Sequence, residues 1–233
     1  NSSSVSSSIS SGVTNIFSNA YAFAALKSDG SVVTWGYSPY GGNSSSVSSS
    51  ISSGVTNIFS TQQAFAALKS DGSVVTWGNS SKGGNSSTVS SAISSGVTNI
   101  FSTTYAFAAL KSDGSVVTWG DSSYGGNSSV ISLGNSSSVS SSISSGVTNI
   151  FSNAYAFAAL KSDGSVVTWG SSSYGGSSST VSSSISSGVT NIFSTDYAFA
   201  ALKSDGSVVT WGNTFYGGNS STVSSSISSG VTN

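Results

Sequence analysis

The chain has 233 residues and a formal net charge of -1, and only 6% of its residues are charged, with no Arg, Glu, His or Cys. This balance argues against nucleic-acid binding, which needs clustered Lys and Arg, and the lack of Cys excludes disulfide bonds and thiol chemistry. The 36% hydrophobic content is enough to fill a core. No apolar run approaches the roughly 20 residues of a membrane-spanning helix, so we expect no membrane insertion.

A fifteen-residue stretch, 22–36, returns with identical sequence four more times, beginning at Ala64, Ala106, Ala156 and Ala198. Each copy contains one tryptophan, and the intervals between successive tryptophans are 42, 42, 50 and 42 residues, for Trp35, Trp77, Trp119, Trp169 and Trp211. A repeat of about 42 residues is typical of propeller blades. The longer interval places an eight-residue loop insertion near 130–137.

Taken in chain order, the repeat at 54–95 predicts three strands and a fourth segment. The strands are 55–60, 64–69 and 73–77, because β-branched and aromatic residues dominate them and a turn residue closes each one. The Ser-Asp-Gly sequence at 70–72 predicts a tight hairpin turn between the second and third strands. In the fourth segment, 88–93, Val89 and Ile93 are four residues apart, which fits an outer edge strand or a short turn.

These elements predict an all-β fold, a β-propeller-like array of five four-stranded repeats that forms either a closed ring or an arc or superhelix of a longer array. We expect a single repeat domain over 1–233, with units at about 12–53, 54–95, 96–145, 146–187 and 188–233. The opening segment returns nearly unchanged at 219–233, so six copies accompany five hairpins. Residues 1–11 would therefore complete a preceding or terminal blade, or the tail of one chain would complete the head of the next.

The repeat resembles the short bacterial form of the regulator-of-chromosome-condensation family. The residues that carry the resemblance are a Gly-Val-x-x-Ile strand, an Ala-Leu-Lys-x-Asp-Gly hairpin and a Val-x-Trp-Gly strand, here Val13, Ile16, Ala25, Leu26, Lys27, Asp29, Gly30, Val33, Trp35 and Gly36. The resemblance covers all five repeats and implies a β-propeller. Two features depart from the family: Ala22 stands where it often has His, and Gly41-Gly42 where it often has Gly-Gln. Nothing matches the residues by which the eukaryotic founding member acts on a small GTPase, so that function is not carried over.

We expect no enzyme activity, no cofactor and no metal site. The missing His, Cys, Glu and Arg remove most general bases, thiol nucleophiles and oxyanion-binding groups. Five of the seven Asp residues occupy the same hairpin turn, where a carboxylate bonding its own backbone is the simpler interpretation. Calcium would need several carboxylates converging, and the turn offers one per repeat.

The tryptophans allow two interpretations. They could be platforms on which sugar rings stack, but each belongs to the same Val-Val-Thr-Trp-Gly strand in every repeat. That repetition favours a packing role, because a buried indole contributes a large apolar surface to a core with few large side chains.

The repeats differ from one another chiefly in two loops, between the first and second strands and between the third and fourth segments. In an antiparallel blade these loops emerge at the same end, opposite the uniform Ser-Asp-Gly turns. Tyrosine with Ser, Asn and Gly is typical of adaptable recognition surfaces, although simple drift in unconstrained loops would look the same. The candidate partner- or ligand-binding face contains Tyr21, Tyr37, Tyr40, Tyr105, Tyr124, Tyr155, Tyr174, Asp196, Tyr197, Phe215 and Tyr216.

The sequence thus predicts a non-enzymatic structural or interaction repeat module of a large bacterial protein, which could assemble head to tail into a filament or matrix. The alternative is an adhesin that binds carbohydrate or protein through the variable tyrosine-rich face. Expected partners are other copies of the chain or further repeats of a longer chain, and also a glycan or a surface protein. The Ser-, Thr- and Asn-rich, Cys-free composition favours an extracellular or cell-surface location.

Overall fold

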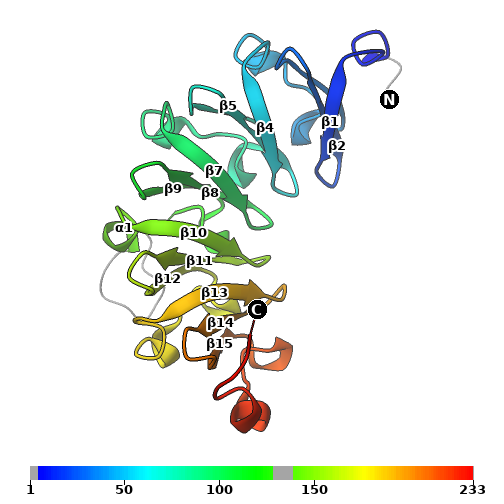
Figure 1. The fold of residues 1–233 in the computed structure, drawn as a ribbon. Coiled ribbons are helices and arrows are strands. Elements are labelled where there is room, and N and C mark those ends of the chain that lie inside the picture. Colours follow the sequence, from blue (N-terminus) through cyan, green and yellow to red (C-terminus); the bar gives the residue numbers. More distant parts are fainter. Residues whose placement is uncertain (1–4, 128–138, 233) are drawn as a thin grey trace. The chain divides into compact units, whose positions relative to one another are not determined.

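The computed structural model describes residues 5–127 and 139–232, which form five three-stranded sheets (Figure 1). The described residues divide into two compact units, one reaching to Ser112 and including Val117–Asp121, the other containing Asp113–Val116 and everything from Ser122 onward. The first three sheets lie in unit 1, apart from the first residue of β9, and the last two lie in unit 2. The insertion predicted near 130–137 lies outside the described residues.

Each sheet has the strand order first, second, third, so the middle strand of every repeat bonds both neighbours. The three strands of each sheet match the predicted positions to within a residue. In order they are β1 (Val13–Ser18), β2 (Ala22–Lys27), β3 (Val32–Gly36), β4 (Val55–Ser60), β5 (Ala64–Lys69), β6 (Val74–Gly78), β7 (Val97–Ser102), β8 (Ala106–Lys111), β9 (Val116–Gly120), β10 (Val147–Ser152), β11 (Ala156–Lys161), β12 (Val166–Gly170), β13 (Val189–Ser194), β14 (Ala198–Lys203) and β15 (Val208–Gly212).

The Ser-Asp-Gly turn closes each hairpin as predicted, and its Asp bonds locally. In the second repeat the Asp71 carboxylate accepts hydrogen bonds from the Ser73 amide at 2.9 Å and the Ser73 hydroxyl at 2.6 Å. Gly72 adopts φ +75°, a conformation that L side chains rarely take. Its carbonyl also accepts the amide of Val97 in the next repeat at 3.0 Å, so the turn helps to join consecutive repeats.

Replacing Ser73 by Ala should raise the pKa of Asp71 towards its ordinary value of 3.8. The Ser73 hydroxyl bond is the largest cause that holds this pKa down, followed by the Ser73 amide bond. Because the folded pKa is depressed, the bond stabilises the hairpin above the ordinary pKa and is lost as pH falls through the folded value. A carboxyl NMR titration measures the shift, with the unchanged turns at Asp29, Asp163 and Asp205 as internal controls. An Asp71 pKa that stays low in the variant would contradict the assignment.

The four-stranded repeat is not confirmed: of the two alternatives for the fourth segment, edge strand or short turn, the described residues show short helical turns. In the second repeat it begins as a 3₁₀ helix at Ser87–Val89, and the Ile93 amide bonds the Val89 carbonyl at 3.2 Å. The four-residue spacing of Val89 and Ile93 suits a helical turn that points both side chains at the core. The intervening serines favour the turn because their hydroxyls bond nearby carbonyls, as Ser94 bonds Ser91. In the fourth repeat the corresponding turn is Ser179–Val181.

The core of unit 1 lies between consecutive sheets. From one side, β2 contributes Ala22, Ala24 and Leu26, and the turn segment contributes Ile51. From the other side, the next repeat contributes Val55, Ile58, Phe65, Ala67 and Trp77. The equivalent set recurs between the second and third repeats. Because alternate residues of a strand point to opposite faces, β5 is buried on both faces, and its alanines are small enough to let the sheets approach closely.

Unit 2 has the same core between its two sheets, with Phe199, Ile192 and Trp211 in the positions of Phe65, Ile58 and Trp77. The Trp211 indole donates to the Gly175 carbonyl of the preceding loop at 3.1 Å, and the Trp169 indole donates to Gly125 at 3.2 Å. In unit 1, Trp77 and Trp119 donate likewise to Gly41 and Gly83, both at 3.1 Å. These four tryptophans are 2% exposed, so the predicted packing role is confirmed for them.

Candidate functional site

In the first, second, fourth and fifth repeats the two variable loops lie at the same end of the sheet, as predicted, and a side chain of one loop bonds the backbone of the other. The Asn19 amide donates to the Tyr40 carbonyl at 2.7 Å, and Asn153 donates to the Tyr174 carbonyl at 2.6 Å. Asn19 also accepts the amides of Tyr21 and Ala22, both at 2.8 Å, which fixes the first loop. A short polar residue at this position therefore holds the two loops as one surface.

In unit 2 these loops bring five tyrosines into a continuous series of ring contacts, here called the tyrosine strip: Tyr124, Tyr155, Tyr174, Tyr197 and Tyr216. Tyr155 is its centre, with ring centroids 5.2 Å from Tyr124, 4.4 Å from Tyr174 and 5.6 Å from Tyr197. Tyr197 in turn lies 5.5 Å from Tyr174 and 4.6 Å from Tyr216. These separations are those of favourable aromatic pairs.

The tyrosine strip partly shields its central hydroxyl from water. The pKa of Tyr155 is raised above its ordinary value of 10.0, first because burial disfavours the phenolate and then because of the neighbouring Tyr197, Tyr124 and Tyr174. The negative charge of Asp196 acts in the same direction. The backbone of Asp196 is fixed beside the strip, because its carbonyl accepts the Ala154 amide at 3.2 Å.

In unit 1 the first repeat has a smaller cluster of three tyrosines. Tyr40 lies 4.9 Å from both Tyr21 and Tyr37, in edge-on arrangements, and Tyr21 lies 6.5 Å from Tyr37. Tyr21 and Tyr37 are among the large side chains most exposed to solvent. This cluster is an aromatic patch with open ring surface.

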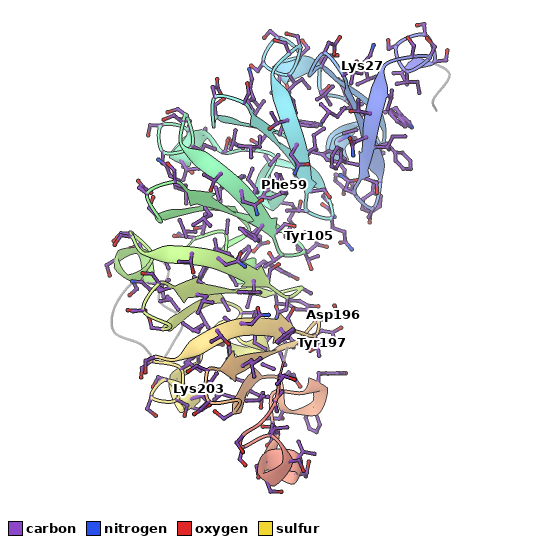
Figure 2. All side chains as sticks on the ribbon, viewed as in Figure 1. Lys27, Phe59, Tyr105, Asp196, Tyr197 and Lys203 are labelled. Carbon is purple, nitrogen blue, oxygen red and sulfur yellow. The ribbon has the colours of Figure 1, made fainter. Side chains whose placement is uncertain are left out.

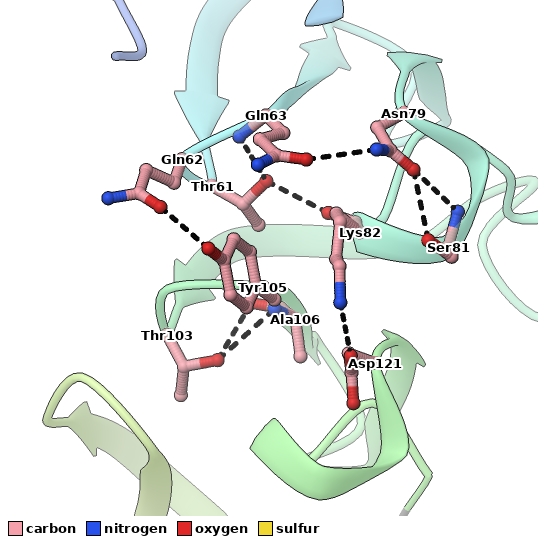
Figure 3. A network of polar contacts seen from close by, with 10 residues as sticks. All are labelled: Thr61, Gln62, Gln63, Asn79, Ser81, Lys82, Thr103, Tyr105, Ala106 and Asp121. Carbon is pink, nitrogen blue, oxygen red and sulfur yellow. Dashed lines mark hydrogen bonds and ion pairs between the residues drawn. The ribbon is translucent and has the colours of Figure 1, made fainter.

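Tyr105 instead joins a polar network in unit 1 (Figure 3). Its hydroxyl donates to the Gln62 side chain at 2.8 Å, and the Lys82 ammonium lies 4.5 Å from its ring centroid. Lys82 is also paired with the Asp121 carboxylate at 2.5 Å, and both side chains are about a quarter exposed or less. Lys82 occupies the loop position that Tyr174 holds in the fourth repeat. The loop face therefore uses a cation where other repeats use an aromatic ring.

The structure thus groups the predicted site residues in different ways. Tyr21, Tyr37 and Tyr40 form one cluster, and the five unit 2 tyrosines with Asp196 form another. Tyr105 takes part in the polar network, and its partners there, Gln62 and Lys82, are not among the predicted site residues. Phe215 is 91% exposed and projects from the last loop. The differences between repeats place Lys82 in a variable loop. They do not indicate that its ammonium lies over the Tyr105 ring, because that contact joins two repeats.

A second candidate surface, missed from the sequence, is the open face of the first sheet. Ile16 is 62% and Phe23 45% exposed, whereas their equivalents Ile58 and Phe65 are 3% and 0% exposed beneath the preceding repeat. The sequence does not indicate this exposure, because every repeat has the same residues at these positions. Only the position of a repeat in the array decides whether this face is covered.

The described residues contain no cluster of three or more His, Cys, Asp or Glu side chains that could hold a metal ion. Nor does any helix within 5–127 or 139–232 have the length and apolar character needed to cross a membrane.

No protein-family model matches the sequence, and no curated protein matches it. Among solved structures, the chain is similar to the crystal structure of human WBSCR16, with 20% identity and a TM-score of 0.50 over 86% of this chain and 61% of that one. It is also similar to a chain in the crystal structure of Kap60 bound to yeast RCC1 (Prp20), with 17% identity and a TM-score of 0.54 over 86% of this chain and 56% of that one. The chain therefore spans less than two thirds of either. These likenesses establish the fold alone, an all-β repeat fold of the RCC1-like propeller type.

Proposed function

We propose that the chain is a non-enzymatic interaction module whose repeats continue head to tail, onto a second copy or onto further repeats of a longer chain. The observation that carries the proposal is the open face of the first sheet. Ile16 and Phe23 there correspond to side chains that every later repeat buries, so a preceding repeat would remove them from water. Burial of one such side chain contributes about 1.5–3 kcal/mol.

The last repeat offers the complementary surface. In earlier repeats the loop glycine lies directly against the Phe ring of the next repeat. A methyl group added at Gly41 or Gly125 would lie 2.6 Å or 2.7 Å from that ring. At Gly217, in the last repeat, the nearest atom to such a methyl group is 3.9 Å away, so this loop is uncovered. Val223, in the last turn segment, is 48% exposed, while its equivalents Val47 and Val181 pack against a core. The Gly217 loop and Val223 would therefore meet Phe23 and Trp35 of another copy.

Sedimentation velocity over a range of concentrations tests this proposal. We expect the protein to associate as concentration rises, and Phe23→Ser to weaken association by at least tenfold because it removes the central ring of the receiving face. Tyr37→Ser is the matched control, because Tyr37 is 55% exposed and its ring contacts, with Tyr21 and Tyr40, lie within its own repeat. Equal association of the two variants would contradict the proposal, and a monomer at every concentration would exclude a second copy as the occupant of the open face.

A second candidate function is supported by the tyrosine strip, which is an aromatic surface on the variable loop face. In this proposal the chain is an adhesin that binds a glycan or a surface protein through the strip. Tyrosine supplies a large contact area at low conformational cost. Composition supports the further proposal, common to both candidates, of a secreted or cell-surface bacterial protein.

A further inference from the structure

We propose that the tyrosine strip, together with Asp196, binds an alkylammonium group such as the side chain of a lysine on a partner protein. The inference rests on the second candidate function, that this face is a binding surface, and it names the chemistry of what binds there. It follows from the charge of the face, from the aromatic contacts and from an arrangement that the same chain contains in unit 1.

Asp196 places a negative charge beside the strip, and in the described part of the chain neither lysine of unit 2 is ion-paired with it. Asp196 is exposed, and within the described residues it forms no salt bridge. The two lysines of unit 2, Lys161 and Lys203, close the far ends of β11 and β14, and Figure 2 shows Lys203 at the opposite end of its strand from Asp196 and Tyr197. A strand of six residues separates these ends by about 20 Å, well beyond the screening length of about 8 Å at physiological salt.

The aromatic contacts favour a cation over a neutral ligand. A ring face carries the negative part of the aromatic quadrupole, so an ammonium within about 6 Å of a ring centroid is attracted to it. Tyr197 follows Asp196 directly in the chain, and Tyr216 lies on the other side of Tyr197 with more than a third of its surface exposed. A cation beside Tyr197 would meet ring faces and a carboxylate together.

Unit 1 already holds an ammonium in this way. There Lys82 lies over the ring of Tyr105, and Tyr105 occupies the loop position that Tyr197 has in the last repeat. Lys82 is also paired with the Asp121 carboxylate. Asp121 and Asp196 occupy different loop positions. In both units, however, a tyrosine ring stands beside one carboxylate. In unit 2 Tyr174 stands at the loop position of Lys82, so an ammonium supplied by a partner would take the place of that lysine.

The test is an NMR titration of the protein with tyrosine-ring labels, using n-butylammonium as the probe and 1-butanol as its neutral analogue. We expect shifts at the rings of the strip, and an affinity for n-butylammonium about fivefold or more above that for 1-butanol. Asp196→Asn should weaken n-butylammonium binding about threefold. The matched control is Asp205→Asn, which removes the same charge from the turn at the far end of β14 and should leave the affinity unchanged.

Three outcomes would overturn the inference. They are equal affinity for the two probes, equal weakening by the two Asp variants, and shifts confined to rings outside the strip. If a neutral oligosaccharide shifts the strip and n-butylammonium does not, the strip remains a binding surface but its ligand is not a cation. If n-butylammonium shifts the strip and the oligosaccharide does not, both the binding surface and its cationic ligand are supported.

Discussion

Replacing Trp77 by Ala should lower the free energy of unfolding by about 3–5 kcal/mol. The indole is 2% exposed, stacks on Phe65 with ring centroids 5.3 Å apart, and donates to the Gly41 carbonyl at 3.1 Å. The substitution therefore leaves a cavity between two sheets and an unpaired carbonyl beneath them. Denaturant titration followed by circular dichroism measures the loss.

Trp35→Ala is the matched control, because the same letters surround it in the first repeat. Trp35 stacks on Phe23 at 5.3 Å, but it is partly exposed, and within the described residues no glycine loop precedes it to accept its indole. We expect its loss to cost less than half as much in the monomer. Equal losses for the two variants would mean that stacking within the sheet, rather than packing between repeats, stabilises the fold.

The Gly83→Ala substitution should destabilise the protein by about 3 kcal/mol, through two additive causes. Gly83 has φ +103°, where an L side chain is strained by about 1–3 kcal/mol. In addition, its new methyl group would lie 2.6 Å from the buried ring of Phe107, and overpacking of this kind costs about 1–3 kcal/mol. Glycine is required here because the positive φ and the nearby Phe107 ring leave no place for a Cβ, while the backbone carbonyl accepts the Trp119 indole.

Gly217→Ala separates the two causes. Gly217 has nearly the same φ, +105°, but its nearest neighbour is the Thr195 methyl at 3.9 Å. In the monomer it should therefore show the strain alone, about half the loss of Gly83→Ala. A Gly217→Ala loss as large as that of Gly83→Ala would remove the repeat-to-repeat clash from the explanation.

Much of the fold could be predicted because its causes are local. The Ser-Asp-Gly turn carries its own hydrogen bonds, and the β-branched strands on either side of it alternate in the way a two-faced sheet needs. The fourth segment could not be assigned with equal success, because the spacing of Val89 and Ile93 suits a strand edge and a helical turn alike. Packing of Ile93 between two sheets selects the turn, and that contact is not visible in the segment itself.

The candidate site divides in the same way. That the two loops share one end follows from strand order, so the variable face could be predicted. Which rings meet could not, since the contact of Tyr155 with Tyr197 joins different repeats and depends on the twist between their sheets. The exposure of Phe23 was also hidden, because its sequence context is identical to that of the buried Phe65.

The most direct test of head-to-tail assembly is iodide quenching of tryptophan fluorescence over a range of protein concentrations. Trp35 is the one tryptophan on the open face, and the other four are buried, so quenching reports on that face. We predict that quenching is present in dilute solution and disappears as concentration rises, with Phe23→Ser shifting the transition to higher concentration. Quenching that stays the same at every concentration would contradict the account.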